Sequence, residues 1–117
     1  MSVIKTECER DGIKNIEIIQ GEEEDPLFPK NSLDLVIMVY VIHHLDNPAP
    51  FLQKIIPSLK SKATLVIVER DPHRYGGEFG HFFSKEKVLE VIKLTDFKLE
   101  RVETFLPRDN IYIFGVK

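Results

Sequence analysis

The most apolar stretch of the chain lies between residues 33 and 44 and has the sequence LDLVIMVYVIHH. Its apolar positions do not recur at helical spacing and several are β-branched, so the stretch favours a strand. An apolar run without polar alternation is typical of a strand buried on both faces, at the centre of a parallel sheet. Polar residues gather at its end, at His43, His44 and Asp46. Because open α/β sheets bind ligands at the carboxyl ends of their strands, we expect the functional site there.

Helical and strand-like patterns alternate along the rest of the chain. Asp46-Asn47-Pro48 and Ser84 are predicted to start helices, and Pro57 is expected to tighten the end of the first one. The alternation predicts an α/β fold with a mostly parallel sheet of about five strands, closed by an antiparallel hairpin. The remaining predicted elements are a helix over 2–12 and strands over 15–20, 63–69, 97–106 and 111–116.

The segment 71–83, DPHRYGGEFGHFF, is rich in glycine and aromatic residues and is long enough to serve as a lid or binding loop. Four of its side chains can ligate metals in principle, but their spacing matches no zinc pattern, so no metal site is predicted. These side chains are Asp71, His73, Glu78 and His81. The acidic run at 22–25 has two interpretations, a solvated loop or part of a ligand site.

Composition narrows the classes of function. The 117 residues suit a single domain over 1–117, and 43% hydrophobic with 30% charged residues is ordinary globular composition. The net charge is −3 and the basic residues are scattered among acidic ones, so the sequence shows no basic patch of the kind that binds nucleic acid. The single cysteine, Cys8, excludes a disulfide framework, and there is no signal peptide and no apolar run of about 20 residues. We expect a cytoplasmic protein that does not engage a membrane.

Several segments occur in an order that is shared with one known family. NIEIIQGEEEDPLFP is similar to a third strand with an acidic turn, and LDLVIMVYVIHHLDNP to a fourth strand and the segment after it. FLQKIIPSLKSKATLVIVERD is similar to the next helix and a fifth strand, and a final helix and reversed hairpin follow in FFSKEKVLEVIKLTDFKLERVETF and IYIFGVK. This ordered set resembles the carboxyl-terminal two thirds of a class I S-adenosylmethionine-dependent methyltransferase of the small-molecule type. The resemblance implies a Rossmann-like methyltransferase fold.

The family's first strand, its glycine-rich turn and the acidic end of its second strand would precede residue 1. By resemblance, the glycine-rich turn approaches the amino-acid portion of the cofactor, and the acid holds the ribose hydroxyls. We therefore expect a truncated, incomplete domain with about half of the cofactor pocket. The turn before the fifth strand is glycine-rich in the family and is Ser61-Lys62-Ala63 here, so any positive φ must fall on a less tolerant residue.

The resemblance implies S-adenosyl-L-methionine as the cofactor and assigns candidate residues to it. Glu22 matches an acid near the adenine amino group, and Glu23 could offer its backbone N–H to the adenine ring. Met38 and Tyr40 end the strand whose backbone approaches the methionine portion, and the Tyr40 ring could contact the sulfonium. Surface charge is the alternative for the two glutamates, and core packing is the alternative for Met38.

His43 and His44 are the candidate catalytic residues. Adjacent strand residues point to opposite faces, so the pair cannot chelate one metal ion from regular strand geometry. One imidazole could act as a base near the transferable methyl group, while packing or helix capping is the structural alternative for each. Methyl transfer requires mainly that the methyl donor and the small-molecule acceptor are held in the right geometry, and it requires a base where the acceptor carries a proton.

Three functions stay open. The first is methyl transfer to a small-molecule acceptor, and the second is a non-catalytic half-domain that associates with another copy or subunit. A nucleotide-binding module is the third, and the terminal hairpin argues against it. The family strands that would precede residue 1 lie between its third and fourth strands, which leaves the central strand with an open edge. We expect either the strand at 15–20 or a second chain, in a homodimer, to close that edge.

Overall fold

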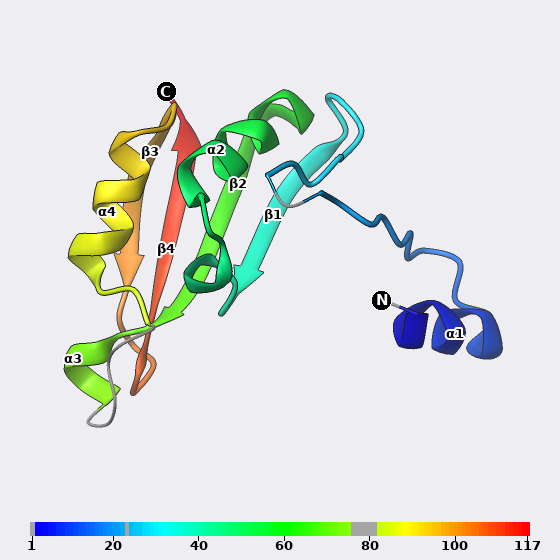
Figure 1. Cartoon of the computed structure of the whole chain (residues 1–117), viewed down its shortest axis with the longest axis horizontal. Helices are drawn as coiled ribbons and strands as arrows, with labels where there is room; N and C mark the ends of the chain where they lie inside the picture. The colour runs from blue at the N-terminus through cyan, green and yellow to red at the C-terminus, as the bar shows by residue number, and fades with distance from the viewer. Residues whose placement is uncertain (1, 23, 76–81) are drawn as a thin grey trace.

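The computed structural model describes residues 2–22, 24–75 and 82–117. Its centre is a four-stranded sheet in the order β1–β2–β4–β3, with α2 and α4 packed on it, and α1 lies apart at the end of an extended segment (Figure 1). The elements are α1 (Ser2–Asp11), β1 (Leu33–Val39), the 3₁₀ turn η1 (Ile42–His44), α2 (Pro48–Ile55), the 3₁₀ turn η2 (Ile56–Ser58), β2 (Leu59–Arg70), α3 (Pro72–Tyr75), α4 (Lys85–Lys93), β3 (Phe97–Glu103) and β4 (Asp109–Val116).

The strand directions confirm the predicted α/β class and the reversed closing hairpin. β1 pairs in parallel with β2, whereas β4 lies antiparallel to both of its neighbours, β2 and β3. Within the described sheet, β4 is therefore the strand that runs against the others. The parallel strands β1 and β2 are joined through α2, as a crossover connection requires.

Local sequence signals account for the helix ends. Pro48 opens α2 at a position where its missing N–H leaves no bond unmade, and Pro57 falls in the tightened turn η2, as predicted. The Ser84 hydroxyl accepts a hydrogen bond from the Lys87 N–H at 3.2 Å and caps α4. Gly12 follows α1 with a φ of 69°, the left-handed conformation that suits glycine after a helix.

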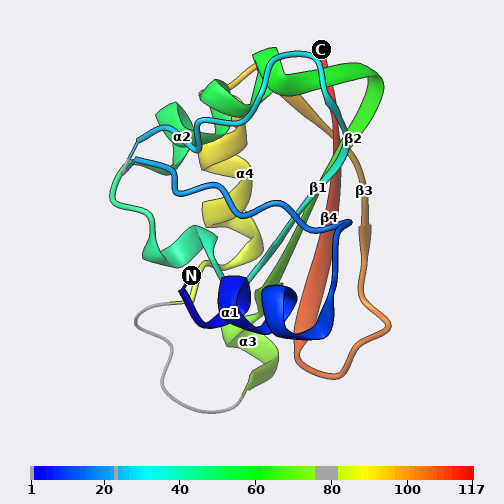
Figure 2. The same ribbon diagram turned by 90° about the vertical axis from the view of Figure 1, so that its right-hand side faces the viewer.

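The core lies between one face of the sheet and the helices α2 and α4 (Figure 2). Alternate residues of β2 point into it, with Leu65 and Ile67 fully buried, and Leu52 enters it from the apolar stripe of α2. β4 supplies the stacked rings of Tyr112 and Phe114, whose centroids are 6.3 Å apart. This packing holds the strands so that β1 and β2 end at one common edge.

β1 departs from the prediction of a strand buried on both faces. Val36 and Met38 face the core, but Leu35, Ile37 and Val39 are 51%, 58% and 50% exposed. Among the described residues, no helix covers the sheet face opposite α2 and α4, and β1 is an edge strand (Figure 2). The uniform apolar run therefore correctly indicates two apolar faces, but only one of them is covered.

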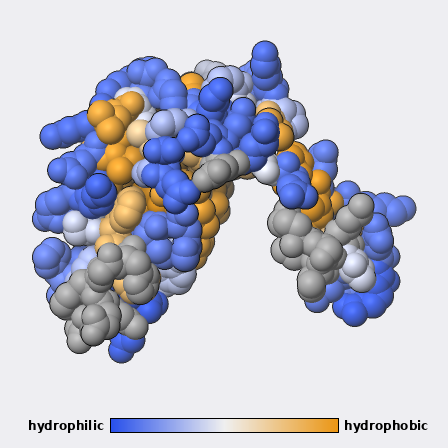
Figure 3. All heavy atoms as spheres, viewed as in Figure 1, coloured by the Kyte–Doolittle hydropathy of each residue, from blue (hydrophilic) through white to orange (hydrophobic). Residues whose placement is uncertain are grey.

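The predicted strand at 15–20 is wrong, because this segment is extended but pairs with no described strand. The sheet consequently has four strands, one fewer than predicted. Ile16 is 49% exposed on this segment. Figure 3 shows hydrophobic residues at the surface along the segment that leads to α1 and on the adjoining side of the body.

The buried hydroxyl of Tyr112 makes the stability of the core depend on pH in the alkaline range. Burial raises the pKa of Tyr112 from 10.0 to about 12. The unfolded chain releases this proton near pH 10 and the folded chain only near pH 12, so the folded state loses stability as the pH rises through this interval.

We expect Tyr112→Phe to be less stable than the natural protein at neutral pH, by about 1 kcal/mol, because it loses the hydrogen bond from Asn110. Between pH 10 and pH 12 that difference should shrink and then reverse, since phenylalanine has no proton to lose. Urea unfolding across this range measures it. Phe114→Leu, at an equally buried position without a titrating group, is the control and should keep a constant difference from the natural protein. A constant difference for Tyr112→Phe would contradict the prediction.

Candidate active site

Three segments of the chain meet at the edge where β1 and β2 end. Tyr40 directly follows β1, and its N–H donates to the Val68 carbonyl at 2.9 Å, which carries the parallel ladder one residue further. Tyr40 has a φ of 57°, uncommon for a residue with a side chain, and the chain turns out of the sheet into η1. Glu69 and Arg70 end β2, and Asp109 begins β4 at the same edge. Polar side chains therefore gather at the carboxyl ends of the strands, as the sequence predicted.

His43 forms a buried pair with Glu69, which we call the histidine–glutamate pair. His43 Nδ1 lies 2.7 Å from Glu69 Oε2, and the two side chains are 4% and 0% exposed. The Phe83 N–H donates to the same carboxylate oxygen at 3.0 Å. Burial raises the pKa of Glu69, and the hydrogen bonds from Phe83 and His43 oppose that shift. The second oxygen, Oε1, is buried and has no hydrogen-bond partner among the described residues, so the carboxylate is not fully satisfied.

Tyr40, Arg70 and Asp109 form a second group beside this pair, which we call the tyrosine cluster. The Tyr40 hydroxyl donates to Asp109 Oδ2 at 2.5 Å and accepts from Arg70 Nη2 at 3.1 Å. Arg70 Nε is 3.2 Å from Asp109 Oδ1, so the carboxylate is bound on both oxygens. The hydrogen bond to Asp109 raises the pKa of Tyr40, with burial adding to it. The phenol is therefore protonated at neutral pH, and its hydroxyl joins Asp109 and Arg70 through hydrogen bonds.

A hollow of about 290 Å³ opens between these groups and is lined largely by rings. The His43 and His44 ring centroids are 4.2 Å apart, and Phe82 meets the His43 ring edge-on at 5.2 Å. The Arg70 guanidinium lies 5.2 Å from the centre of the Tyr40 ring, within cation–π range. Ring faces and one cation suit a small planar or polarisable group. The lining residues are Tyr40, His43, His44, Arg70 and Phe82.

The predicted cofactor residues are placed in different surroundings. Met38 is buried in the core, so packing accounts for it, while Tyr40 lines the hollow. Glu22 is exposed, and its backbone forms a small bridge with Asp25, at 2.6 Å and 3.2 Å for the two N–H···O bonds. Glu23 lies outside the described residues.

The acidic turn around residues 22–25 is attached to the start of α2. Asn47 Nδ2 donates to Glu24 Oε1 at 2.6 Å, and Asn47 makes no side-chain cap on its own helix. Gly21 permits the turn to close, because a Cβ there would lie 2.9 Å from Pro26 Cα and 3.0 Å from its carbonyl oxygen. Glu24 thus connects the turn to the segment that leaves the candidate active site.

The described residues contain no group of three or more metal-binding side chains, and no described helix is long and apolar enough to cross a membrane. His73 is exposed and lies 4.0 Å from Glu86, and Asp71 accepts from Asn110 at 3.2 Å. Glu78 and His81 of the predicted lid or binding loop lie outside the described residues.

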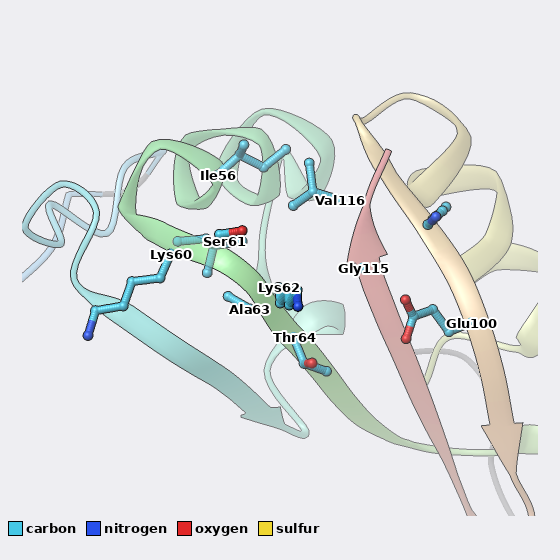
Figure 4. A pocket seen from close by; sticks show the side chains of 11 residues that line it. Ile56, Lys60, Ser61, Lys62, Ala63, Thr64, Glu100, Gly115 and Val116 are labelled. Carbon is cyan, nitrogen blue, oxygen red and sulfur yellow. The ribbon is translucent and has the colours of Figure 1, made fainter.

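A larger hollow of about 430 Å³ lies away from this site, around the amino-terminal half of β2 (Figure 4). Its lining includes Lys62 and Thr64 of β2, Lys98 and Glu100 of β3 and Gly115 of β4. Lys62 has a φ of 66°, which confirms that a positive φ before the apolar half of β2 falls on a less tolerant residue. This hollow contains no member of the histidine–glutamate pair or of the tyrosine cluster.

Sequence reasoning did not single out four residues of the site: Glu69, Arg70 and Asp109, and Phe82 of the predicted lid or binding loop. Glu69 and Arg70 end an apolar strand just as His43 follows one, so the same carboxyl-end rule would have found them. Asp109 carried no such signal, because its place depends on how β4 inserts beside β2.

Comparison with known proteins gives one family and one fold. The family model described as a methyltransferase domain matches residues 1–67. A crystal structure of a SAM-dependent methyltransferase from Aquifex aeolicus has a TM-score of 0.85 at 20% identity, covering 97% of this chain and 61% of that one. The PH0226 protein from Pyrococcus horikoshii OT3 has a TM-score of 0.75 at 16% identity, covering 97% of this chain and 65% of that one.

The O-methyltransferase NcsB1 from neocarzinostatin biosynthesis, in complex with S-adenosyl-L-homocysteine and 1,4-dihydroxy-2-naphthoic acid, is also similar. Its TM-score is 0.79 at 12% identity, covering 99% of this chain and 39% of that one. A search of curated proteins gave no significant match. The chain thus spans less than two thirds of the length of each of these structures. Because the family model covers more than half of the sequence, the chain belongs to the methyltransferase-domain family.

Proposed function

We propose that this chain takes part in methyl transfer from S-adenosyl-L-methionine to a small-molecule acceptor, at the edge where β1 and β2 end. The observation that carries the proposal is the histidine–glutamate pair, held at 2.7 Å beside a ring-lined hollow. Membership of the methyltransferase-domain family supports the methyl donor. Two of the similar structures are named for this cofactor or contain its demethylated product.

The described residues suit one side of a cofactor site. Glu22 is exposed and makes no side-chain hydrogen bond among the described residues, so its carboxylate is able to accept from an adenine amine. Tyr40, turned out of the sheet by its positive φ, presents its ring in the hollow, with Arg70 over that ring at 5.2 Å. When bound, S-adenosyl-L-methionine supplies an electrophilic methyl group. We propose that the chain provides only part of its pocket, in keeping with the greater length of the similar structures.

The histidine–glutamate pair is suited to removing a proton from the acceptor. In the tautomer that directs the Nδ1 proton of His43 at Glu69, the lone pair is on the other ring nitrogen, Nε2. A neutral imidazole held in this tautomer can accept a proton from a hydroxyl or amine as the methyl group transfers. Glu69 orients the ring and stabilises the imidazolium that forms, so we assign it as a positioning residue. His44, whose ring is more exposed, lines the hollow on the solvent side.

We also propose that the chain forms a homodimer in which the second copy covers the open edge of β1. Edge strands are usually protected from association by proline or by charged side chains. β1 has no proline and only one charged residue, Asp34. A non-catalytic half-domain that associates through this edge is the second candidate function. The exposed apolar side chains of Leu35, Ile37 and Val39 favour association in either case.

We expect calorimetry with S-adenosyl-L-methionine to give a dissociation constant above about 100 μM, in the weaker part of the range of about 1 μM to 1 mM in which enzyme KM values fall. An incomplete pocket leaves several polar groups of the cofactor without partners. Micromolar affinity for this chain alone would contradict the proposal of a partial pocket, while leaving the proposed chemistry in place.

We expect slow methyl transfer at millimolar cofactor to a panel of hydroxyl and amine acceptors, followed with radiolabelled methyl groups. His43→Ala should lower kcat about 10²-fold, because it removes the base. Glu69→Gln should lower kcat less and shift the pH dependence of kcat, because the imidazole keeps its place with a weaker partner. His73→Ala, at an exposed position away from the hollow, is the control. Cofactor binding without transfer to any acceptor would favour the non-catalytic half-domain.

We expect Glu69→Ala to destabilise the protein by about 3 kcal/mol, because it leaves both the His43 imidazole and the Phe83 N–H without their buried partner. Glu69→Gln retains an acceptor oxygen and should cost about 1 kcal/mol. Urea unfolding measures both. Glu90→Ala, on the exposed face of α4, should change stability by less than about 0.5 kcal/mol. Equal effects at residues 69 and 90 would show that the pair does not stabilise the fold.

A further inference from the structure

We propose that two copies of this chain exchange their amino-terminal arms, so that residues 15–20 of one copy add a strand to the open edge of β1 in the other. This inference rests on the homodimer proposed above and specifies how its interface is built. Exchange of an identical element is a low-cost route to a dimer, since each bond made in one direction is repeated in the other.

The first observation is an arm, residues 12–20, whose strand-forming part pairs with no described strand. Its sequence NIEIIQ alternates apolar and polar positions at Ile16, Glu17 and Ile18, the pattern of a half-buried strand. Figure 1 shows the segment as an extended trace, and no hydrogen bond joins its backbone at 14–20 to any described residue. An extended segment that leaves its N–H and C=O groups to water is ready to pair with a sheet edge.

The second observation is the open edge of β1, which is about as long as the segment 15–20 of the arm. One edge of β1 pairs with β2, and the other edge pairs with no described strand over its seven residues. Leu35, Ile37 and Val39, each about half exposed, point away from the core along this strand. An added strand would place Ile16 and Ile18 on one face and extend the apolar surface of β1. Glu17 is balanced by Lys14 within the arm, so the approach to β1 does not concentrate one sign of charge.

The third observation is that the arm points away from the β1 edge of its own chain. Several hydrogen bonds hold the connector to β1, among them the bond from Asn47 to Glu24 and the bond from the Ser32 N–H to the Ser58 carbonyl at 2.8 Å. Gly21 packs against Pro26 at the start of this connector. Figure 1 shows the arm leaving the body from that point and extending away from the sheet. The arm of one copy can therefore pair with the open β1 edge of a second copy, and the arm of the second copy with the β1 edge of the first.

The test uses the full chain and a variant that blocks the arm. Adjacent N–H groups of a strand point to opposite sides, so Ile16→Pro combined with Glu17→Pro removes one donor from the pairing side in any register. Neither N–H is bonded within the described structure, so the monomer should fold as before, with an unchanged circular dichroism spectrum. Ile13→Ala is the matched control, because Ile13 is exposed and lies in the arm but outside the exchanged segment.

We expect light scattering over a dilution series to give a mass twice the 13.6 kDa of the chain, falling to one chain on dilution. The double proline variant should raise the dimer dissociation constant at least about tenfold, and Ile13→Ala should leave it within about twofold. Hydrogen–deuterium exchange should be slow in the dimer at 15–20 and at those amides of 33–39 that face away from β2. In the diluted monomer these amides should exchange rapidly, while the β1 amides paired with β2 stay protected.

Two results would overturn the inference in distinguishable ways. A dimer that is unaffected by the double proline variant, with slow exchange at the outward-facing amides of 33–39 but not at 15–20, would mean that two β1 edges meet directly. The proposed homodimer would then stand without arm exchange. A chain that stays monomeric at every concentration would overturn the homodimer and the exchange together, and the methyl-transfer assay would still report on the active site independently.

Discussion

The parallel pairing of β1 with β2 is the interaction on which both the fold and the candidate active site depend. β1 has no other strand neighbour among the described residues, so this one ladder determines where the strand ends. Its last bond, from the Tyr40 N–H to Val68, brings the turn after β1 beside the end of β2. The His43 imidazole reaches Glu69 because the two strands finish at the same level. A shift of register between them would separate the pair without changing either strand.

Features decided by short stretches of chain were predictable from the sequence. Pro48, Pro57 and Ser84 act on the backbone within one turn of themselves, so the ends of α2 and α4 followed directly. The location of the site followed as well, because polar residues after an apolar strand must lie at its carboxyl end. The partner of His43 did not follow, since it depends on the register of two strands whose apolar sequences allow several alignments.

The two wrong predictions share one cause: each assumed that another part of the chain packs against the segment or pairs with it. The sequence of β1 is apolar on both faces, but α2 and α4 cover only the face of Val36 and Met38. The segment 15–20 has the composition of a strand, but a strand exists only when another backbone pairs with it. Composition therefore indicated correctly that each segment is able to pack or pair with another element. Whether such an element is present depends on the whole assembly and cannot be read from a local pattern.

Gly21 limits how this sequence can drift over generations. The atoms that a side chain would meet there, at 2.9 Å to 3.1 Å, belong to the backbone of Pro26 and Asp25 and cannot rotate aside. Even alanine would force apart the base of the turn and strain the contact of Glu24 with Asn47. Lineages of this gene should therefore retain glycine at this position, so that the least conspicuous residue of the turn becomes its most durable.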